Sequence, residues 1–274
     1  EHGGSEVQIR YGQIDVRVLG ERLVVRAGKF LVPMGVFNSF LYPEFIAKLP
    51  DRPFVLREIV PVSWAEVGIQ IRGRYEWRQG SAIGYALYLV NGLEQADDPT
   101  APGADEGGAI RDMRNNFIDS HHSDKAFGFR LGVEPTPGLT FGVSGYFGAY
   151  TVDGARRLSI GDVDVGLRRG NLTIRGELVG AVQEITGSSL TKRGFYAVAS
   201  YRVFGIIEPV LEFDAIWLDG AAAGDRMRAT VGLILYPFPD KVPTLVLKQS
   251  YAATWDRAGD PISHRFVAQL AIGF

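Results

Sequence analysis

Hydrophobic and polar residues alternate one by one over long stretches of the chain. Within residues 67–78, Ile69 and Ile71 share one side of an extended strand, and Arg72 and Arg74 share the other. Successive side chains of a β-strand point to opposite faces, so this stretch has one apolar wall and one charged wall. The same pattern recurs to the end of the sequence, and it predicts an all-β protein built from amphipathic strands.

The alternation divides the chain into about thirteen strands of about 8–14 residues. Soluble strands are commonly about 5–6 residues long, whereas a tilted strand that crosses a membrane needs about 9–11. The length of the segments therefore favours membrane-spanning strands. The predicted strands cover residues 6–19, 22–28, 64–78, 81–91, 124–135, 138–149, 159–168, 171–184, 193–204, 206–217, 225–236, 243–254 and 263–274.

The connections between these strands alternate between short and long. Tight turns are expected near Gly20, 79–80, 135–138, 169–170 and 204–205, with a slightly longer one at 237–242. Longer loops are expected at 29–63, 92–123, 150–158, 185–192, 218–224 and 255–262. Short turns on one side and long loops on the other are typical of outer-membrane barrels.

A sheet inside lipid must close on itself, because no water is available there to pair with open N–H and C=O groups. The charged faces would then line a wet interior and the apolar faces would contact hydrocarbon. We therefore predict a transmembrane antiparallel β-barrel that occupies residues 1–274 as a single domain. A soluble β-sandwich or barrel that binds a ligand is the alternative, and it would place the apolar faces inside.

Composition narrows the function further. The net charge is −2 and no basic stripe is evident, which gives no reason to expect a nucleic-acid partner. The chain has no cysteine, which excludes disulfides and thiolate metal sites. No stretch reaches the about 18 consecutive apolar residues that a transmembrane helix needs.

The order of turns and loops also leads to an expectation about the ends of the barrel. With tight turns on the periplasmic side, residues 1–5 lie outside and Phe274 lies at the periplasmic face, so the strand count is odd. Complete single-chain bacterial barrels usually have an even count. We expect one or three upstream strands to be missing from this sequence.

Two stretches carry a family resemblance. Residues 26–38 contain Gly28-Lys29-Phe30 followed by Pro33-Met34-Gly35, and residues 49–53, 59–61 and 64–68 continue it. These motifs resemble the phosphate-selective porins of the O and P type, and the final Phe274 is similar to an outer-membrane assembly signal.

The resemblance implies a bacterial outer-membrane porin with about 16 strands in the full protein, assembled as a homotrimer in outer-membrane lipid. It also implies that the loop at 29–63 folds inward as a constriction. Lys29, Lys48, Arg52 and Arg57 are the cationic candidates on this loop. No lysine cluster of the family's kind is evident.

Charged residues on the polar faces of the strands are the candidate pore lining. Rings of charged side chains set ion preference in channels, and the excess of guanidinium groups leans towards anions. The alternative is that these groups pair across strands and only keep the wall solvated. The candidates are Arg26, Arg72, Arg74, Arg78, Arg130, Arg175, Glu177, Arg202, Glu212, Arg226, Arg228, Lys248 and Arg265.

Other chemistry is weakly represented. The loop at 92–123 holds acidic residues and two histidines, but without EF-hand spacing a solvated loop explains them better than a metal site. A barrel hydrolase that uses His264 or His121 is a remote alternative, because no nucleophile motif accompanies these residues. The carboxylic acids needed for glycoside chemistry cannot be judged without geometry.

The sequence therefore predicts a non-enzymatic porin, without cofactor or metal, through which small hydrophilic solutes or ions diffuse passively. A structural barrel whose lumen is plugged by a partner protein is the second hypothesis.

The loop residues that gave rise to the metal hypothesis are Asp97, Asp98, Asp105, Glu106, Asp112, Asp119, His121 and His122.

Overall fold

The structure, a computed structural model, describes residues 11–41, 47–61, 63–95, 110–114, 124–151, 153–219, 225–242, 244–256 and 263–272. Thirteen strands form one sheet, and each strand pairs antiparallel with the next in sequence. They are β1 (Gly12–Arg17), β2 (Val24–Leu31), β3 (Ala65–Arg78), β4 (Ser81–Val90), β5 (Ala126–Thr136), β6 (Leu139–Ala149), β7 (Arg157–Arg169), β8 (Leu172–Ile185), β9 (Ser188–Tyr201), β10 (Ile207–Leu218), β11 (Arg226–Leu235), β12 (Val246–Asp256) and β13 (Ser263–Ala271).

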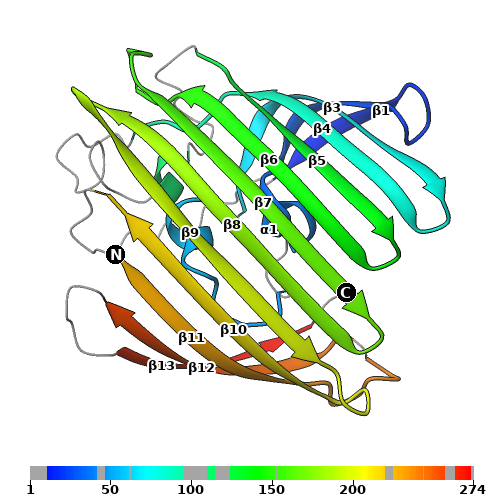
Figure 1. Cartoon of the computed structure of the whole chain (residues 1–274). Coiled ribbons are helices and arrows are strands. Elements are labelled where there is room, and N and C mark those ends of the chain that lie inside the picture. The colour runs from blue at the N-terminus through cyan, green and yellow to red at the C-terminus, as the bar shows by residue number, and fades with distance from the viewer. Residues whose placement is uncertain are drawn as a thin grey trace.

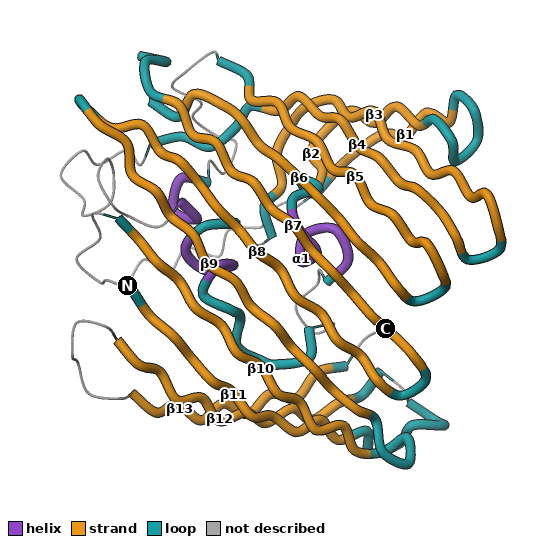
Figure 2. Tube along the Cα trace, in the orientation of Figure 1, coloured by secondary structure: helices purple, strands orange, loops and turns teal. Residues whose placement is uncertain are grey.

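The sheet curves strongly, so that its strands wrap around a space that holds the helices (Figures 1 and 2). Because neighbours in sequence are neighbours in the sheet, the strands form an up-and-down meander in which no strand crosses over another. The predicted all-β architecture and the predicted strand count are both confirmed.

The convex face of the sheet is apolar and exposed. Side chains of Ile69, Ile71 and Tyr75 on β3 are 55%, 42% and 48% exposed. Arg72 and Arg74 alternate with them and point to the concave side, where they pair with carboxylates. A soluble sandwich or small soluble barrel would bury the apolar set, so this arrangement argues against the soluble alternative.

The concave side holds a segment of the chain between β2 and β3, which we call the inner segment (residues 32–41 and 47–61). It contains α1 (Gly35–Phe40) and α2 (Val55–Glu58). α1 contacts β6 and β7, whereas α2 contacts β9, β10 and the short 3₁₀ helix η2 (Ile110–Met113). No helix within the described ranges has the length and apolar run needed to cross a membrane.

The interior is not lined by charge alone. Apolar side chains of the inner segment, among them Phe37, Leu56 and Ile59, pack against inward-facing Tyr146 and Ile160 of the wall. The expectation that charged faces line a wet interior is therefore wrong where the inner segment covers the wall. Burying apolar surface on both sides of this contact stabilises the segment against the sheet.

Two local expectations are also wrong. The predicted loop at 185–192 is a tight hairpin, because β8 ends at Ile185 and β9 begins at Ser188. Gly187 has a φ of +75°, a conformation that glycine adopts without the steric cost that a Cβ would add. Lys29, predicted on the inward loop, lies within β2 in register with Gly12 and Val67.

Candidate functional site: charged contacts of the inner segment

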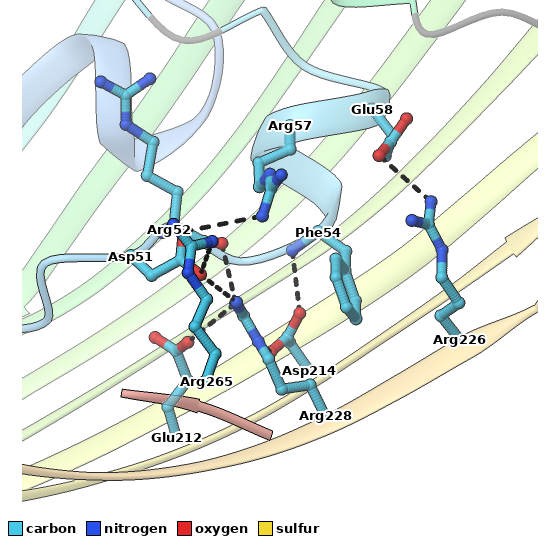
Figure 3. Close-up of polar contacts among 10 residues, drawn as sticks. All are labelled: Asp51, Arg52, Phe54, Arg57, Glu58, Glu212, Asp214, Arg226, Arg228 and Arg265. Atoms are coloured by element: carbon cyan, nitrogen blue, oxygen red, sulfur yellow. Dashed lines mark hydrogen bonds and ion pairs between the residues drawn. The ribbon is translucent and has the colours of Figure 1, made fainter. Parts of the chain in front are cut away.

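The carboxylate of Asp51 on the inner segment contacts three arginine side chains from separate elements (Figure 3). Its Oδ2 accepts hydrogen bonds from Nη1 of Arg228 on β11 at 2.8 Å and Nη1 of Arg265 on β13 at 3.2 Å. Arg57 on α2 lies with Nη1 3.7 Å from Oδ1. We call these four residues the Asp51 cluster. It joins strands and a helix that are far apart in the sequence.

Arg228 is the most heavily engaged cation of this cluster. Its Nε donates to Asp214 at 2.8 Å, its Nη2 donates to the carbonyl oxygen of Arg52 at 2.7 Å, and Glu212 lies 3.5 Å from Nη2. The Arg228 side chain is only 3% exposed. Guanidinium offers five donors in a planar fork, which suits it to such shared, buried pairing.

Phe54 fixes the start of α2 against the same wall. Its backbone N–H donates to Oδ1 of Asp214 at 2.8 Å, and the guanidinium groups of Arg226 and Arg228 lie 5.0 and 4.7 Å from the centre of its ring. Arg226 also pairs with Glu58 at 3.1 Å (Figure 3). A short helix with no side-chain cap is thus held mainly by contacts with the sheet.

A second set of contacts anchors the inner segment nearer its residue 47. Lys48 Nζ lies 2.5 Å from Glu208 Oε1, and the hydroxyls of Ser200 and Tyr236 donate to the same carboxylate at 2.6 Å each. Lys248 on β12 donates to the carbonyl oxygen of Ala47 at 2.5 Å. The segment is therefore tethered to β10, β11, β12 and β13.

α1 rests on a third group of polar side chains. The N–H of Gly35 donates to Ser144 Oγ at 3.0 Å, and that hydroxyl donates to Asp162 at 3.1 Å. Nearby, Glu177 accepts a hydrogen bond from the Tyr196 hydroxyl at 2.9 Å. A Cβ on Gly35 would overlap Oε1 of Glu177, and Gly35 has a φ of +61°. Both facts favour glycine at this position.

Arg130 on β5 belongs to the same region. It pairs with Asp164 at 2.8 Å and lies 5.5 Å from the ring centre of Phe40 at the end of α1. Two of the predicted residues, Arg130 and Glu177, thus lie beside the same helix, α1. They are separate from the Asp51 cluster, which contacts α2 instead.

The structure brings together only part of the predicted pore lining. Arg228, Arg265 and Glu212 meet at Asp51, Arg226 reaches Glu58, and Lys248 contacts the inner segment. Arg175 lines a small hollow beside Tyr196 and the inner segment. Of the loop candidates, Lys48, Arg52 and Arg57 all lie on the inner segment, with Arg52 stacked over Phe37 at 5.2 Å.

The other predicted residues lie elsewhere. Arg26 and Arg72 share Asp15 of β1, at 2.7 and 3.0 Å, and Arg74 pairs with Glu134. Arg78 is exposed at the end of β3. Arg202 donates to the carbonyl oxygen of Gly205 and lies 3.8 Å from the Tyr236 ring centre, next to a turn. The contacts of Arg26, Arg72 and Arg74 fit the alternative of cross-strand pairing.

Sequence reasoning missed Asp51 and Glu58 as site residues. Asp51 lies in the motif at 49–53 that carried part of the family resemblance, which was the available signal.

His264 contacts Tyr251, with 2.6 Å between the hydroxyl and Nδ1. Asp97, Asp98, Asp105, Glu106, Asp119, His121 and His122 of the metal hypothesis lie outside the described residues.

A cavity of about 330 Å³ remains between the inner segment and β11–β13. Its lining includes Arg57, Arg226, Arg228 and Arg265, together with Asp51 and Asp256. Guanidinium groups bind oxyanions by charge-assisted hydrogen bonds, and those of Arg57 and Arg265 are the more exposed ones in this cavity. In the part of the chain that is described, no three metal-ligating side chains gather into a cluster.

Comparison with solved structures identifies proteins that share this architecture. The anion-selective porin from Comamonas acidovorans aligns over 96% of this chain and 76% of its own, with a TM-score of 0.60 and 13% identity. A loop-L8 deletion form of OmpT, an outer membrane protein of Vibrio cholerae, aligns over 94% and 78%, with a TM-score of 0.55 and 11% identity. The chain has the fold of outer-membrane β-barrels.

Sequence comparison adds less about this barrel. An uncharacterised protein of Aquifex aeolicus is 27% identical over 151 residues, which make up 55% of this chain. The matched stretch spans 32% of that relative, about a third of its length. No protein-family model matches the sequence, so membership of the phosphate-selective porins remains a prediction.

Proposed function

We propose that the protein is a porin of the bacterial outer membrane, through which small hydrophilic solutes diffuse passively. The observation that carries the proposal is the two-sided sheet, with its apolar side chains exposed and its charged side chains turned inward beside an arginine-lined cavity. The exposed guanidinium groups of Arg57 and Arg265 keep that cavity hydrated, and a hydrated path through a barrel is a channel.

The proposed solutes are small anions, phosphate among them. Guanidinium groups on β11, β13 and α2 line one cavity, and an excess of cationic groups in a channel favours anions over cations. The inner segment, which brings Lys48, Arg52 and Arg57 towards the wall, is the proposed constriction. The resemblance to phosphate-selective porins supports this assignment and extends it to a homotrimer. The proposal involves no chemical step on the solute.

Conductance of the complete protein in planar phospholipid bilayers tests the proposal. We expect stepwise increases in current and, in a potassium chloride gradient, a reversal potential of the sign that chloride movement gives. The same detergent without protein is the control. A folded protein that inserts without current steps would support the plugged scaffold instead, and a cation-type reversal potential would refute the anion preference.

A further inference from the structure

The Asp51 cluster has the chemistry of an anion-binding site. A single carboxylate lies where three guanidinium groups converge from β11, β13 and α2, with the nearest nitrogens at 2.8, 3.2 and 3.7 Å. Carboxylate and phosphate oxygens accept the same charge-assisted hydrogen bonds from arginine. The geometry of the Asp51 cluster is thus already that of an oxyanion site, filled by a side chain of the protein.

The three arginines of the cluster are not equally committed to the protein. Arg228 is 3% exposed and is also held by Asp214, Glu212 and the carbonyl oxygen of Arg52. Arg265 and Arg57 are 60% and 36% exposed, and both line the cavity of about 330 Å³. Arg265 and Arg57 are therefore the cations on which a solute anion can compete with Asp51.

The cavity offers further groups to such an anion. Thr254 and Ser263 line it and contribute hydroxyl donors, whereas Asp256 adds a second negative charge. Arg226 is held by Glu58, so its charge is largely balanced within the inner segment. Removing the Asp51 carboxylate would therefore leave unbalanced positive charge mainly on Arg57 and Arg265.

We propose that Asp51 is the residue that sets the charge selectivity of the channel, because its carboxylate competes with small oxyanions for Arg57 and Arg265. This inference rests on the proposed porin function and names its specificity-determining residue. In the wild-type protein the internal carboxylate keeps anion binding weak enough for the ion to leave. Without it, the cavity becomes a tighter anion site.

The inner segment is held by contacts that do not involve Asp51. Phe54 remains bonded to Asp214, Lys48 to Glu208 and Glu58 to Arg226, and Leu56 and Ile59 stay in the buried core. Replacing Asp51 by the isosteric asparagine should therefore leave the segment in place. The substitution then changes the charge of the cavity and not the position of the inner segment.

The experiment compares Asp51→Asn with the wild-type protein in planar bilayers. We expect the anion-to-cation permeability ratio, obtained from reversal potentials, to rise about threefold to tenfold, as a unit charge several ångströms from an ion in a water-like medium would produce. Added inorganic phosphate should also reduce the chloride current of Asp51→Asn at lower concentration than that of wild type. Migration of unheated samples on denaturing gels checks that each barrel has folded.

Asp153→Asn is the matched control, since it removes one carboxylate from the connection between β6 and β7. Hydrogen bonds from the Thr151 hydroxyl and the Ala155 N–H lower the pKa of Asp153, so this residue is charged at neutral pH. Its substitution should leave the permeability ratio unchanged. In Asp51→Asn/Arg265→Gln, one released cation is removed, and the ratio should fall back towards wild type.

The outcomes separate the two proposals. If the wild-type protein forms no channel, the proposed function fails and this inference falls with it. If the wild-type protein conducts and Asp51→Asn has an unchanged ratio, the inference alone is wrong. If the double variant keeps the raised ratio, the charge on Arg265 did not cause the effect, which also refutes the inference.

Discussion

Asp214 and Glu212 are buried carboxylates that depend on one cation. Their side chains are 0% and 5% exposed, and Arg228 contacts both from the neighbouring strand. Taking charges out of water is costly, so each carboxylate needs its partner far more than an exposed one does. At the scale of the residue, Arg228 therefore matters first for the stability of the wall and of the contacts that hold the inner segment.

Replacing Arg228 by methionine should destabilise the barrel by about 3 kcal/mol, because it leaves buried carboxylates without their cation. Denaturant-induced unfolding of the protein in phospholipid vesicles measures this free energy. Arg17→Met is the comparison, since the Arg17–Glu21 pair is 68% and 67% exposed. Exposed pairs contribute about 0.5 kcal/mol. Equal losses in the two variants would show that the Arg228 site is solvated.

At the scale of the element, strands could be predicted from the sequence because each one carries its own evidence. β3 alternates through Ile69, Ile71, Arg72 and Arg74, and its observed bounds, Ala65–Arg78, lie within one residue of the predicted ones. The β8–β9 hairpin was missed because the polar residues around Gly187 resemble a loop. What continues through this stretch is the alternation of buried and exposed positions, with Leu190 and Lys192 both buried.

The inner segment could not be predicted in the same way. α1 and α2 are too short to be stable by local propensity and depend on the sheet for their stability. Asp51 and Arg228 are 177 residues apart, and alternation says which face Arg228 lies on but not which loop residue will reach it. The sequence therefore predicts which strand face each candidate pore-lining residue lies on. The contacts that make up the Asp51 cluster can be seen only in the three-dimensional structure.

Docking of α1 on the wall gives a prediction for a whole element. Gly35→Ala should loosen α1, because the new Cβ meets Glu177 and because alanine is strained at a φ of +61°. Trypsin should then cut the inner segment after Lys48 or Arg57 faster than in wild type. Gly161→Ala on β7, where an added Cβ meets nothing within 4 Å, is the control. Equal cleavage rates in both variants would contradict this role for Gly35.

At the scale of the whole molecule, the sheet separates two environments. The convex face exposes Leu178 and Phe266 at 59% and 66%, whereas the concave face holds the charged pairs and the inner segment. An apolar band around an entire sheet is unfavourable in water and favourable in hydrocarbon. Outer-membrane barrels, whose fold this chain shares, also place their apolar side chains against hydrocarbon. The exposed apolar surface and the strand topology therefore both favour a membrane environment.

Consecutive residues of β12 can test this separation directly. Thr254 lines the arginine-rich cavity, and Ala253 lies on the opposite face between the exposed rings of Tyr251 and Trp255. Because the chain has no cysteine, Thr254→Cys and Ala253→Cys each introduce a single thiol. In reconstituted vesicles, a negatively charged methanethiosulfonate should modify Thr254→Cys many times faster, since hydrocarbon excludes a charged reagent from Ala253→Cys. Similar rates with the charged reagent would mean that both faces meet water, and the membrane assignment would then be wrong.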